Sequence, residues 1–342
     1  MKKTDTTIID QPWPEHELEH VNACPYCGSR DRTLAYKDVQ DWSFYAAPGK
    51  WSYWDCKKCE ALYLSPRPTE VSIGKAYASY YTHGSIEGSL LQKYKIKLKN
   101  ECFSSWLNTS ITPRLNLPNF LHFLLNPLKK LLYIPFGLEQ LVTLPKGKLL
   151  DVGCGSGGML KIAKDLGWDV TGLEIDPNAV KAAKEQGLNV IEGSFYHLAQ
   201  LTDDFDCVIC SHVLEHVYEP ATLINLLTKV LKPQGVLLLS LPNSKSHVRS
   251  LYGENWRGIE APRHLGIPAL SWVVDLLHEK GFSNMQQQDI YYGTCVESNR
   301  IMKRLHSIKL LDFIYIKLKQ IIAGKSVGFD SDFIQLIARK GA

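Results

Sequence analysis

The sequence predicts an α/β fold built on a parallel sheet, preceded by a small cysteine-rich module. Three observations support this. From residue 147 onward, short apolar segments typical of strands alternate with segments of helical periodicity. A glycine-rich loop, "DVGCGSGG", directly follows the first apolar segment. Four of the nine cysteines form two pairs of the CxxC type, and both pairs lie before residue 60.

The chain divides into three predicted parts. Residues 20–68 hold both cysteine pairs and many aromatic residues, enough for a small β-rich module. Residues 69–146 are predicted to form a helical lid or connector with basic segments such as "LLQKYKIKLKNECFSSWL", and Tyr77 and Tyr81 share one helical face there. Residues 147–342 form the α/β domain, which carries a basic helical insertion at about 294–329.

Composition and charge narrow the class of protein. Hydrophobic residues make up 45% and charged residues 22% of the chain, as in ordinary globular proteins. No apolar stretch follows Lys2 and Lys3, and prolines and lysines interrupt the most apolar window, 117–136. We therefore expect a cytoplasmic protein without a signal peptide or membrane span.

Basic residues are unevenly distributed along the chain. Between residues 86 and 148, nine lysines and arginines face three acidic residues, and segment 294–329 is similarly basic. Such helices predict an anionic partner, and peripheral contact with a membrane surface is one candidate. The alternative is that these helices pack on the α/β domain.

The cysteine pairs are "CPYC" and "CKKC", which place Cys24, Cys27, Cys56 and Cys59 at metal-ligand spacing. Four thiolates suit a closed, structural, tetrahedral Zn²⁺ site. The odd total of cysteines argues against a disulfide framework. A nucleic-acid-binding finger is disfavoured because the segment between the pairs is rich in aromatic residues and poor in cations. The remaining alternative is that the cysteines pack without a metal.

Regular elements of the α/β domain follow from the periodicity. Strands are predicted at 148–153, 169–175, 189–193, 206–211, 235–242, 284–292 and 332–340, and helices at 158–166, 177–186, 219–231 and 270–280. The last strand follows a helical insertion instead of a simple crossover.

The glycine loop fits two patterns. Gly153, Gly155 and Gly158 match the dinucleotide-binding pattern GxGxxG, whereas Gly153, Gly155 and Gly157 match the GxGxG loop of proteins that bind S-adenosylmethionine (SAM). About 20 residues later Glu174 ends the second strand, where a carboxylate binds the ribose hydroxyls of either cofactor.

Three features favour SAM. Asp151 precedes the first glycine and suits the methionine ammonium of SAM. The fourth and fifth strands lead into "FDCVICSHVLEHVYEP" and "LKPQGVLLLSLPN", and "APRHLGIPALSWVVDLLHEKGF" and "DFIQLIARK" follow instead of a second nucleotide-binding half. The chain resembles class I SAM-dependent methyltransferases of the small-molecule and sugar group over about residues 145–290 and 330–340, which implies a Rossmann-like sheet. The cysteine module resembles the zinc-binding N-terminal region of methyltransferases in sugar and surface-polysaccharide pathways.

The resemblance implies SAM-binding roles for individual residues. Asp151 would meet the ammonium, Glu174 the ribose and Ile175 the adenine. In "GSFYHL", Ser194 and Phe195 stand where the family has Asp before a small residue, so the adenine amino contact would fall to Ser194 Oγ. The implied SAM-binding set is Asp151, Gly153, Gly155, Gly157, Glu174, Ile175, Ser194, Phe195, Ser211 and His212.

Histidines are the residues expected to remove a proton from the methyl acceptor. Methyl transfer to oxygen or carbon requires removal of a proton, which suits His near neutral pH. His212, Glu215 and His216 lie at i, i+3 and i+4, so one predicted helical turn presents all three side chains, and His264 lies in "PRHLG".

Three roles for these residues remain open. In the first, His216 or His264 is a general base oriented by Glu215. In the second, His212, Glu215, His216 and His264 hold a divalent cation, which resembles the ExxEH sites of quinone-type and small-RNA 2′-O-methyltransferases. In the third, the histidines only pack. The sequence favours the base, because His212 replaces the first carboxylate of that motif.

The predicted function is SAM-dependent methylation of a sugar or related small molecule, in surface-polysaccharide or natural-product biosynthesis, with no nucleic-acid partner. Arg257 and Arg263 are candidates to bind the phosphate of a nucleotide- or lipid-linked sugar, with a surface salt bridge as the alternative. A quinone- or lipid-type O-methyltransferase at the membrane surface and a non-catalytic SAM-binding scaffold are the other functional hypotheses.

Overall fold

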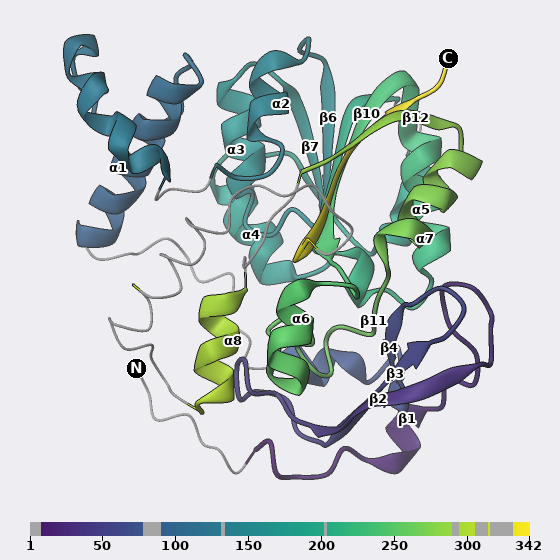
Figure 1. Ribbon diagram of the computed structural model, residues 1–342. Coiled ribbons are helices and arrows are strands. Elements are labelled where there is room, and N and C mark those ends of the chain that lie inside the picture. The colour runs from purple at the N-terminus through teal and green to yellow at the C-terminus, as the bar shows by residue number, and fades with distance from the viewer. Residues whose placement is uncertain are drawn as a thin grey trace. The chain divides into compact units, whose positions relative to one another are not determined.

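The computed structural model describes residues 8–77, 90–130, 134–201, 204–288, 294–304, 314 and 331–342 (Figure 1). The chain groups into two compact units. The cysteine unit comprises Met1–Tyr80, His212–Asn225 and Ser240–Leu336, and the sheet unit comprises Tyr81–Ser211, Leu226–Leu239 and Ile337–Ala342. The units therefore alternate along the chain, whereas the sequence analysis divided it into three successive parts. That division stays a prediction.

The main sheet contains seven strands in the order β12-β13-β10-β9-β6-β7-β8. They are β6 (Lys148–Val152), β7 (Asp169–Glu174), β8 (Val190–Glu192), β9 (Phe205–Ser211), β10 (Leu231–Pro242), β12 (Phe282–Gln287) and β13 (Phe333–Lys340). β6 pairs in parallel with both β7 and β9, and β7 pairs in parallel with β8. The α/β fold with a parallel sheet is therefore confirmed, and the predicted strand 284–292 is described only to residue 288.

The strand order separates this sheet from the dinucleotide-binding fold. Numbered along the chain from β6, the order is 3-2-1-4-5-7-6, whereas the dinucleotide-binding order is 3-2-1-4-5-6. The additional strand is β13, which lies between β10 and β12. This position accounts for the apolar "DFIQLIARK" segment at the end of the chain.

The predicted helices form close to their expected bounds. They are α3 (Gly158–Asp165), α4 (Pro177–Glu185), α5 (Pro220–Val230) and α7 (Leu270–Glu279). α4 starts where expected because the Asp176 side chain accepts a hydrogen bond from the Asn178 amide and Pro177 occupies the first helical position. α3 and α4 lie beside β6 and β7 (Figure 1) and bury Leu160, Ala163, Val180 and Ala183. A short helix, η4 (Phe195–Gln200), follows β8.

The predicted connector contains η2 (Ile73–Tyr77), α1 (Leu90–Trp106), η3 (Asn119–Lys130) and α2 (Leu138–Thr143). α1 confirms the helix expected for the basic segment, whereas Tyr81 lies outside the described residues. α1 and η3 are joined by Glu101, whose buried Oε1 lies 3.0 Å from His122 Nε2. Within the described ranges, no helix combines the length and apolarity required to cross a bilayer.

The cysteine unit contains a second, antiparallel sheet with the order β11-β4-β3-β2 (Figure 1). Its strands are β2 (Arg32–Val39), β3 (Trp51–Cys56), β4 (Leu62–Leu64) and β11 (Gly266–Ile267), and β1 (Leu18–Glu19) pairs separately with β5 (Arg67–Pro68). The core includes Trp51, Tyr53, Leu62 and Leu64. β11 comes from about 200 residues later in the chain and was not predicted.

The remaining elements are short helices. They are η1 (Glu15–Glu17), η5 (Leu214–His216), α6 (His247–Tyr252), η6 (Gly253–Asn255) and α8 (Cys295–Met302). α6 was not predicted. α8 occupies the start of the predicted basic insertion, and most of the rest of that insertion lies outside the described residues.

Candidate functional site

The glycine loop follows β6 and connects it to α3. Gly153, Gly155 and Gly157 all have positive φ, at 75°, 54° and 83°. A Cβ on Gly157 would lie 2.3 Å from Leu188 Cδ1, whereas a Cβ on Gly158 would meet nothing within 4 Å. The backbone therefore requires glycine at the three GxGxG positions and not at Gly158. This selects the SAM-type pattern over the dinucleotide pattern.

Glu174, at the end of β7, is held against this loop. Its Oε2 accepts a hydrogen bond from the Gly155 amide at 2.8 Å. Its Oε1 accepts from the amides of Ile175 at 2.8 Å and Asp176 at 2.9 Å. The carboxylate is thereby fixed beside the loop, as a ribose-binding acid requires. The Ile175 side chain is 69% exposed, which leaves an apolar surface next to Glu174.

Asp151 is a second buried carboxyl at the same edge of the sheet. It lies on β6, one strand from Glu174, and only 5% of its surface is exposed. Burial, followed by the negative charge of Glu174, raises the pKa of Asp151 to about 7. A cationic group bound here would favour the ionised carboxylate, which agrees with the predicted contact to the methionine ammonium.

Ser211 ends β9, and Ser194 directly precedes η4. The carboxyl ends of the parallel strands β6, β7 and β9 meet at one edge, where α/β sheets bind ligands. Ser194 does not cap η4 with its side chain, and the Phe195 ring lies 4.1 Å from that of Tyr196. The roles assigned to Ser194, Phe195 and Ser211 stay predictions.

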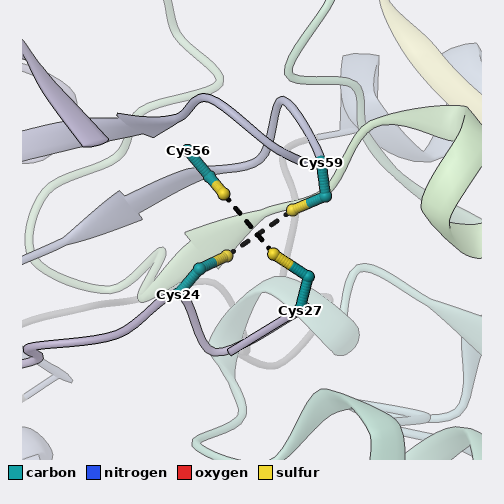
Figure 2. Close-up of side chains that lie close together, drawn as sticks. All are labelled: Cys24, Cys27, Cys56 and Cys59. Atoms are coloured by element: carbon teal, nitrogen blue, oxygen red, sulfur yellow. Dashed lines mark hydrogen bonds between the residues drawn. The ribbon is translucent and has the colours of Figure 1, made fainter. Parts of the chain in front are cut away.

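The four paired cysteines converge, as Figure 2 shows. Cys24 Sγ lies 3.5 Å from Cys59 Sγ, and Cys27 Sγ lies 3.5 Å from Cys56 Sγ. All four sulfur atoms lie within 4.8 Å of one another. Tetrahedral Zn²⁺ with bonds of about 2.3 Å separates its sulfur ligands by about 3.8 Å. The side chains therefore fit a four-thiolate zinc site.

The two cysteine turns have the same local geometry. Gly28 and Glu60, which follow the second cysteine of each pair, both have left-handed φ, at 70° and 58°. This conformation lets the amides of Ser29 and Ala61 donate to Cys27 and Cys59. Burial raises the pKa of Cys27 to about 11, so the thiol alone stays protonated at neutral pH. A thiolate at Cys27 therefore needs a bound cation.

A second cluster in the cysteine unit consists of Glu215, His216 and His264, each of which offers a ligand atom within 4.8 Å of the others. His264 Nδ1 lies 2.6 Å from the Gly258 carbonyl, and His216 Nδ1 lies 3.0 Å from the Arg263 carbonyl. Because a carbonyl only accepts, each ring donates a hydrogen bond from Nδ1 to its carbonyl, which leaves Nε2 as the ring nitrogen available to a ligand. Burial lowers the pKa of His264 to about 4, which keeps the ring neutral.

Glu215 is fully buried within this cluster. Its Oε1 lies 3.0 Å from His212 Nδ1, and its Oε2 has no hydrogen-bond partner among the described residues. Burial raises the pKa of Glu215, but the hydrogen bond to His212 and the neighbouring imidazoles together bring it below its ordinary value. The cluster thus contains an ionised carboxylate with one unsatisfied oxygen. Burying an unpaired oxygen of this kind reduces the stability of the fold unless the oxygen binds a cation or a hydrogen-bond donor.

The predicted helical turn for His212, Glu215 and His216 is wrong. The turn η5 covers only Leu214–His216, and His212 has a left-handed φ of 56°. Its side chain is half-exposed, and its ring meets Phe333 edge-on at 5.4 Å. His212 contacts Glu215 but does not belong to the three-residue cluster, so the predicted four-ligand set becomes three.

The predicted phosphate site at Arg257 and Arg263 is also wrong. The Arg263 side chain is fully buried, with Nη2 2.7 Å from Asp41 Oδ2 and Nε 3.0 Å from the Ala76 carbonyl. Arg257 forms an ion pair with Glu260. Both guanidinium groups are therefore held by internal acceptors, in ion pairs with buried carboxylates and not in the surface salt bridge that was the alternative.

Two residues near the cluster, Glu260 and Tyr77, had no role at this cluster in the sequence-based prediction. Glu260 is buried, and its Oε2 lies 3.6 Å from His264 Nε2. Burial raises the pKa of Glu260, but Arg257 and His264 lower it to about 2, so it is a permanent anion. The Tyr77 hydroxyl lies 3.1 Å from His216 Nδ1. Neither residue belongs to a recognisable motif, and both contacts depend on tertiary packing.

Known proteins support the class suggested by this geometry. Residues 121–287, just under half of the chain, match a family model described as a methyltransferase domain. The ubiquinone biosynthesis O-methyltransferase of Xanthomonas campestris pv. campestris is 36% identical over 109 residues, which cover 30% of this chain and 46% of the relative. That of Hydrogenovibrio crunogenus is 30% identical over 137 residues, covering 37% and 55%. The chain thus spans about half the length of the curated relatives it matches.

Solved methyltransferases are similar at lower sequence identity. A SAM-dependent methyltransferase from Archaeoglobus fulgidus is 19% identical with a TM-score of 0.43, and the match covers 70% of this chain and 98% of that one. Another, from Mesorhizobium loti, is 17% identical with a TM-score of 0.41, covering 60% and 96%.

The strand order, the GxGxG loop and the matched family model define a class I SAM-dependent methyltransferase domain. The described residues also include a four-cysteine cluster and a separate cluster of one glutamate and two histidines. The predicted class and its SAM cofactor are thereby confirmed. The roles of individual site residues stay predictions.

Proposed function

We propose that this protein transfers the methyl group of SAM to a hydroxyl oxygen of a small-molecule acceptor, with a divalent cation bound by Glu215, His216 and His264. The observation that carries the proposal is the buried Glu215 Oε2, which has no hydrogen-bond partner within the described structure. Glu215 clusters with two imidazoles whose Nδ1 atoms contact backbone carbonyls. Such backbone contacts orient metal-binding histidines in other proteins.

The donor set suits some cations better than others. Two imidazoles and one carboxylate favour borderline metals such as Mn²⁺, Co²⁺ or Zn²⁺ over Mg²⁺, which prefers oxygen ligands. When bound, the cation makes an acceptor hydroxyl acidic near neutral pH. The general-base alternative assigns proton removal to His216 or His264, but it leaves Glu215 Oε2 unexplained.

The other residues bind and orient SAM in this proposal. Asp151 holds the methionine ammonium and Glu174 the ribose hydroxyls, while the amides of the glycine loop approach the cofactor closely. In the transfer, the acceptor hydroxyl releases its proton to water, and its oxygen forms a bond to the methyl carbon as the carbon–sulfur bond breaks, which leaves S-adenosylhomocysteine. Positioning supplies most of the rate gain in such a displacement.

Chelation followed by cation replacement tests the cation. We expect a chelator that spares the four-cysteine site to abolish turnover, and Mn²⁺ or Co²⁺ to restore it better than Mg²⁺. Glu215→Gln should lose at least about 100-fold in kcat, in line with removal of a group that acts in the transition state. The matched control is Glu219→Gln, because Glu219 is exposed at the start of α5. Full activity of the cation-free protein, with loss in His216→Ala or His264→Ala, would establish the base instead.

The acceptor class divides into two candidates. A sugar is supported by the resemblance of the cysteine module to those of sugar and surface-polysaccharide methyltransferases. A quinone-type acceptor with a phenolic hydroxyl is supported by the similarity to ubiquinone biosynthesis O-methyltransferases. Mass spectrometry of reactions with SAM and a panel of nucleotide sugars and prenylated catechols separates the two. Methylation of neither class, with SAM bound, would favour a SAM-binding scaffold.

Peripheral membrane contact is a further part of the proposal. On η3 the side chains of Phe120, Phe123 and Leu124 are all more than half exposed. The neighbouring α1 carries exposed Lys93 and Lys95. Apolar and cationic side chains together suit an anionic bilayer. Sedimentation should show binding to phosphatidylglycerol vesicles and not to phosphatidylcholine vesicles, and Phe120→Ser with Phe123→Ser should abolish it. Equal sedimentation of the protein with both kinds of vesicle would show that lipid charge does not contribute to binding.

A further inference from the structure

The segment that carries His264 is held in place by strands of the cysteine module. β11 pairs with β4, so that Gly266 lies opposite Tyr63 and Ile267 opposite Leu62. The Leu64 amide extends this pairing by donating to the Leu265 carbonyl at 3.0 Å. The backbone immediately after His264 is therefore fixed to β4.

Tyr53 fixes the same segment from the next strand. It lies on β3 and is fully buried. Its hydroxyl lies 3.0 Å from the His264 carbonyl and 3.1 Å from the Ile259 carbonyl, so one proton is shared between two buried acceptors. These contacts tie down both ends of the loop that runs from Ile259 to His264.

The same segment is linked to the other two members of the cluster. His216 Nδ1 contacts the Arg263 carbonyl at 3.0 Å, and the Leu265 amide donates to the Glu215 carbonyl at 2.8 Å. The three side chains thus come from two short segments that are bonded directly to each other. A shift of residues 263–265 would move His264 relative to Glu215 and His216.

The turn that joins β3 to β4 is the second cysteine turn. β3 ends at Cys56, and β4 begins three residues after Cys59. The Cys56 amide donates to the Ala61 carbonyl at 2.9 Å, and the Glu60 amide donates to the Cys56 carbonyl at 3.0 Å. A cation held by the four cysteines would therefore close the hairpin that carries both Tyr53 and Leu64.

We infer that Tyr53 is a positioning residue for His264, and that the cysteine hairpin couples the four-cysteine site to the Glu215–His216–His264 cluster. The functional part of this inference rests on the proposed function, because it assigns the cluster a bound cation. The geometric part concerns residues 263–267 alone. Loss of zinc should therefore loosen this segment and leave the SAM loop unchanged.

Tyr53→Phe tests the hydroxyl, and Tyr63→Phe is its matched control. Tyr63 is equally buried on the adjacent β4, but its hydroxyl is near Arg32 and makes no hydrogen bond to the 259–264 loop. In zinc-loaded protein titrated with Co²⁺, we expect Tyr53→Phe to weaken cation binding at the cluster about tenfold, equivalent to ~1.4 kcal/mol. The SAM dissociation constant should stay within twofold, kcat should fall, and KM for SAM should not change. Tyr63→Phe should match the wild type.

Hydrogen exchange of the wild-type protein tests the coupling between the four-cysteine site and residues 263–267 without a variant. It therefore tests the inference even if Tyr53→Phe fails to fold. Zinc removal should speed amide exchange at residues 263–267 and leave residues 153–157 unchanged. Equal exchange rates with and without zinc, or unaltered Co²⁺ affinity in folded Tyr53→Phe, would overturn the inference. Absence of a second cation in the wild type would instead overturn the proposed function, and the exchange measurement would still test the hairpin.

Discussion

At the residue scale, the proposed cofactor site contains two buried carboxyl groups that differ in the contacts that surround them. Glu174 accepts three backbone hydrogen bonds, whereas Asp151 owes its pKa of about 7 first to burial and then to Glu174. Asp151 is thus ionised above about pH 7 and neutral below it. A bound ammonium interacts strongly only with the ionised form.

SAM affinity should consequently depend on pH. Lowering the pH from 7.5 to 5.5 protonates Asp151, so the SAM dissociation constant measured by calorimetry should rise about tenfold. Asp151→Asn should bind weakly and show no such dependence. Glu174→Ala should weaken binding at every pH and move the midpoint downward, because a charge that raises the pKa of Asp151 is removed. A wild-type profile that is flat over this range would refute the assignment of Asp151.

Single residues were predictable where a motif fixes them. The spacing from the glycines to Glu174 and the grouping of Glu215 and His216 follow from local sequence. Tyr53 and Glu260 were not predictable, since their contacts to His264 and its loop depend on how distant segments pack. Periodicity carries no information on such contacts. The same limit applies to Arg263, whose partner Asp41 is 222 residues away.

The glycine loop yields a prediction at the scale of elements. Gly157 has a φ of 83° and faces Leu188, whereas Gly158 begins α3 in open space. Gly157→Ala should lower the free energy of unfolding by about 2–4 kcal/mol through backbone strain and overpacking. Gly158→Ala should change it by less than about 1 kcal/mol, with the sign favouring stability. Urea denaturation of both variants checks this, and equal losses would contradict the GxGxG assignment.

The cysteine turns yield the second prediction at this scale. We expect the four cysteines to hold about one zinc per chain in purified protein, independently of SAM and of any cation at the Glu215–His216–His264 cluster. Cys56→Ser should lose the metal and lower the thermal midpoint, because Cys56 also ends β3. Cys207→Ser is the control, since Cys207 lies on β9 and outside the cluster. Elemental analysis decides the point, and wild-type protein with four titratable thiols and no zinc would rule the site out.

Elements with a clear period were predicted well, and short ones were not. The central strands β9 and β10 contain continuous apolar runs, and α3, α4, α5 and α7 have helical periodicity. α4 also has a capping Asp. β11 has two residues, too few for any period. Residues 212–216 have helical spacing in the sequence. His212 nevertheless adopts a left-handed conformation, so no helix begins at this residue.

At the scale of the whole molecule, the two units alternate along the chain. The sheet unit draws on Tyr81–Ser211, Leu226–Leu239 and Ile337–Ala342, so no contiguous stretch contains the whole unit without residues of the cysteine unit. The fold class was predictable because strand and helix alternation is a local property. The alternation of the units was not, because it reflects which distant segments pack together.

A fragment of residues 81–211 should therefore not form a functional domain. It retains β6, β7, β8 and β9 but lacks β10, the neighbour of β9 in the sheet. Val208, Ile209 and Cys210, which are buried in the full chain, would lie on an unpaired edge strand. We expect aggregation, no cooperative unfolding in circular dichroism and no heat of SAM binding. A soluble fragment that binds SAM would show that the later strands are dispensable.

The pairing of β4 with β11 also affects the order in which these strands can pair during synthesis. About 200 residues separate the two strands, so at a synthesis rate of about 5–20 residues per second β4 waits roughly 10–40 s for its partner. During that interval Leu62, Tyr63 and Leu64, all fully buried later, form the outer edge of a nascent hairpin. Its turn already contains Cys56 and Cys59, and Cys24 and Cys27 have been made before it. Metal captured on the ribosome would then hold the hairpin in register until the segment that follows His264 arrives to cover its edge.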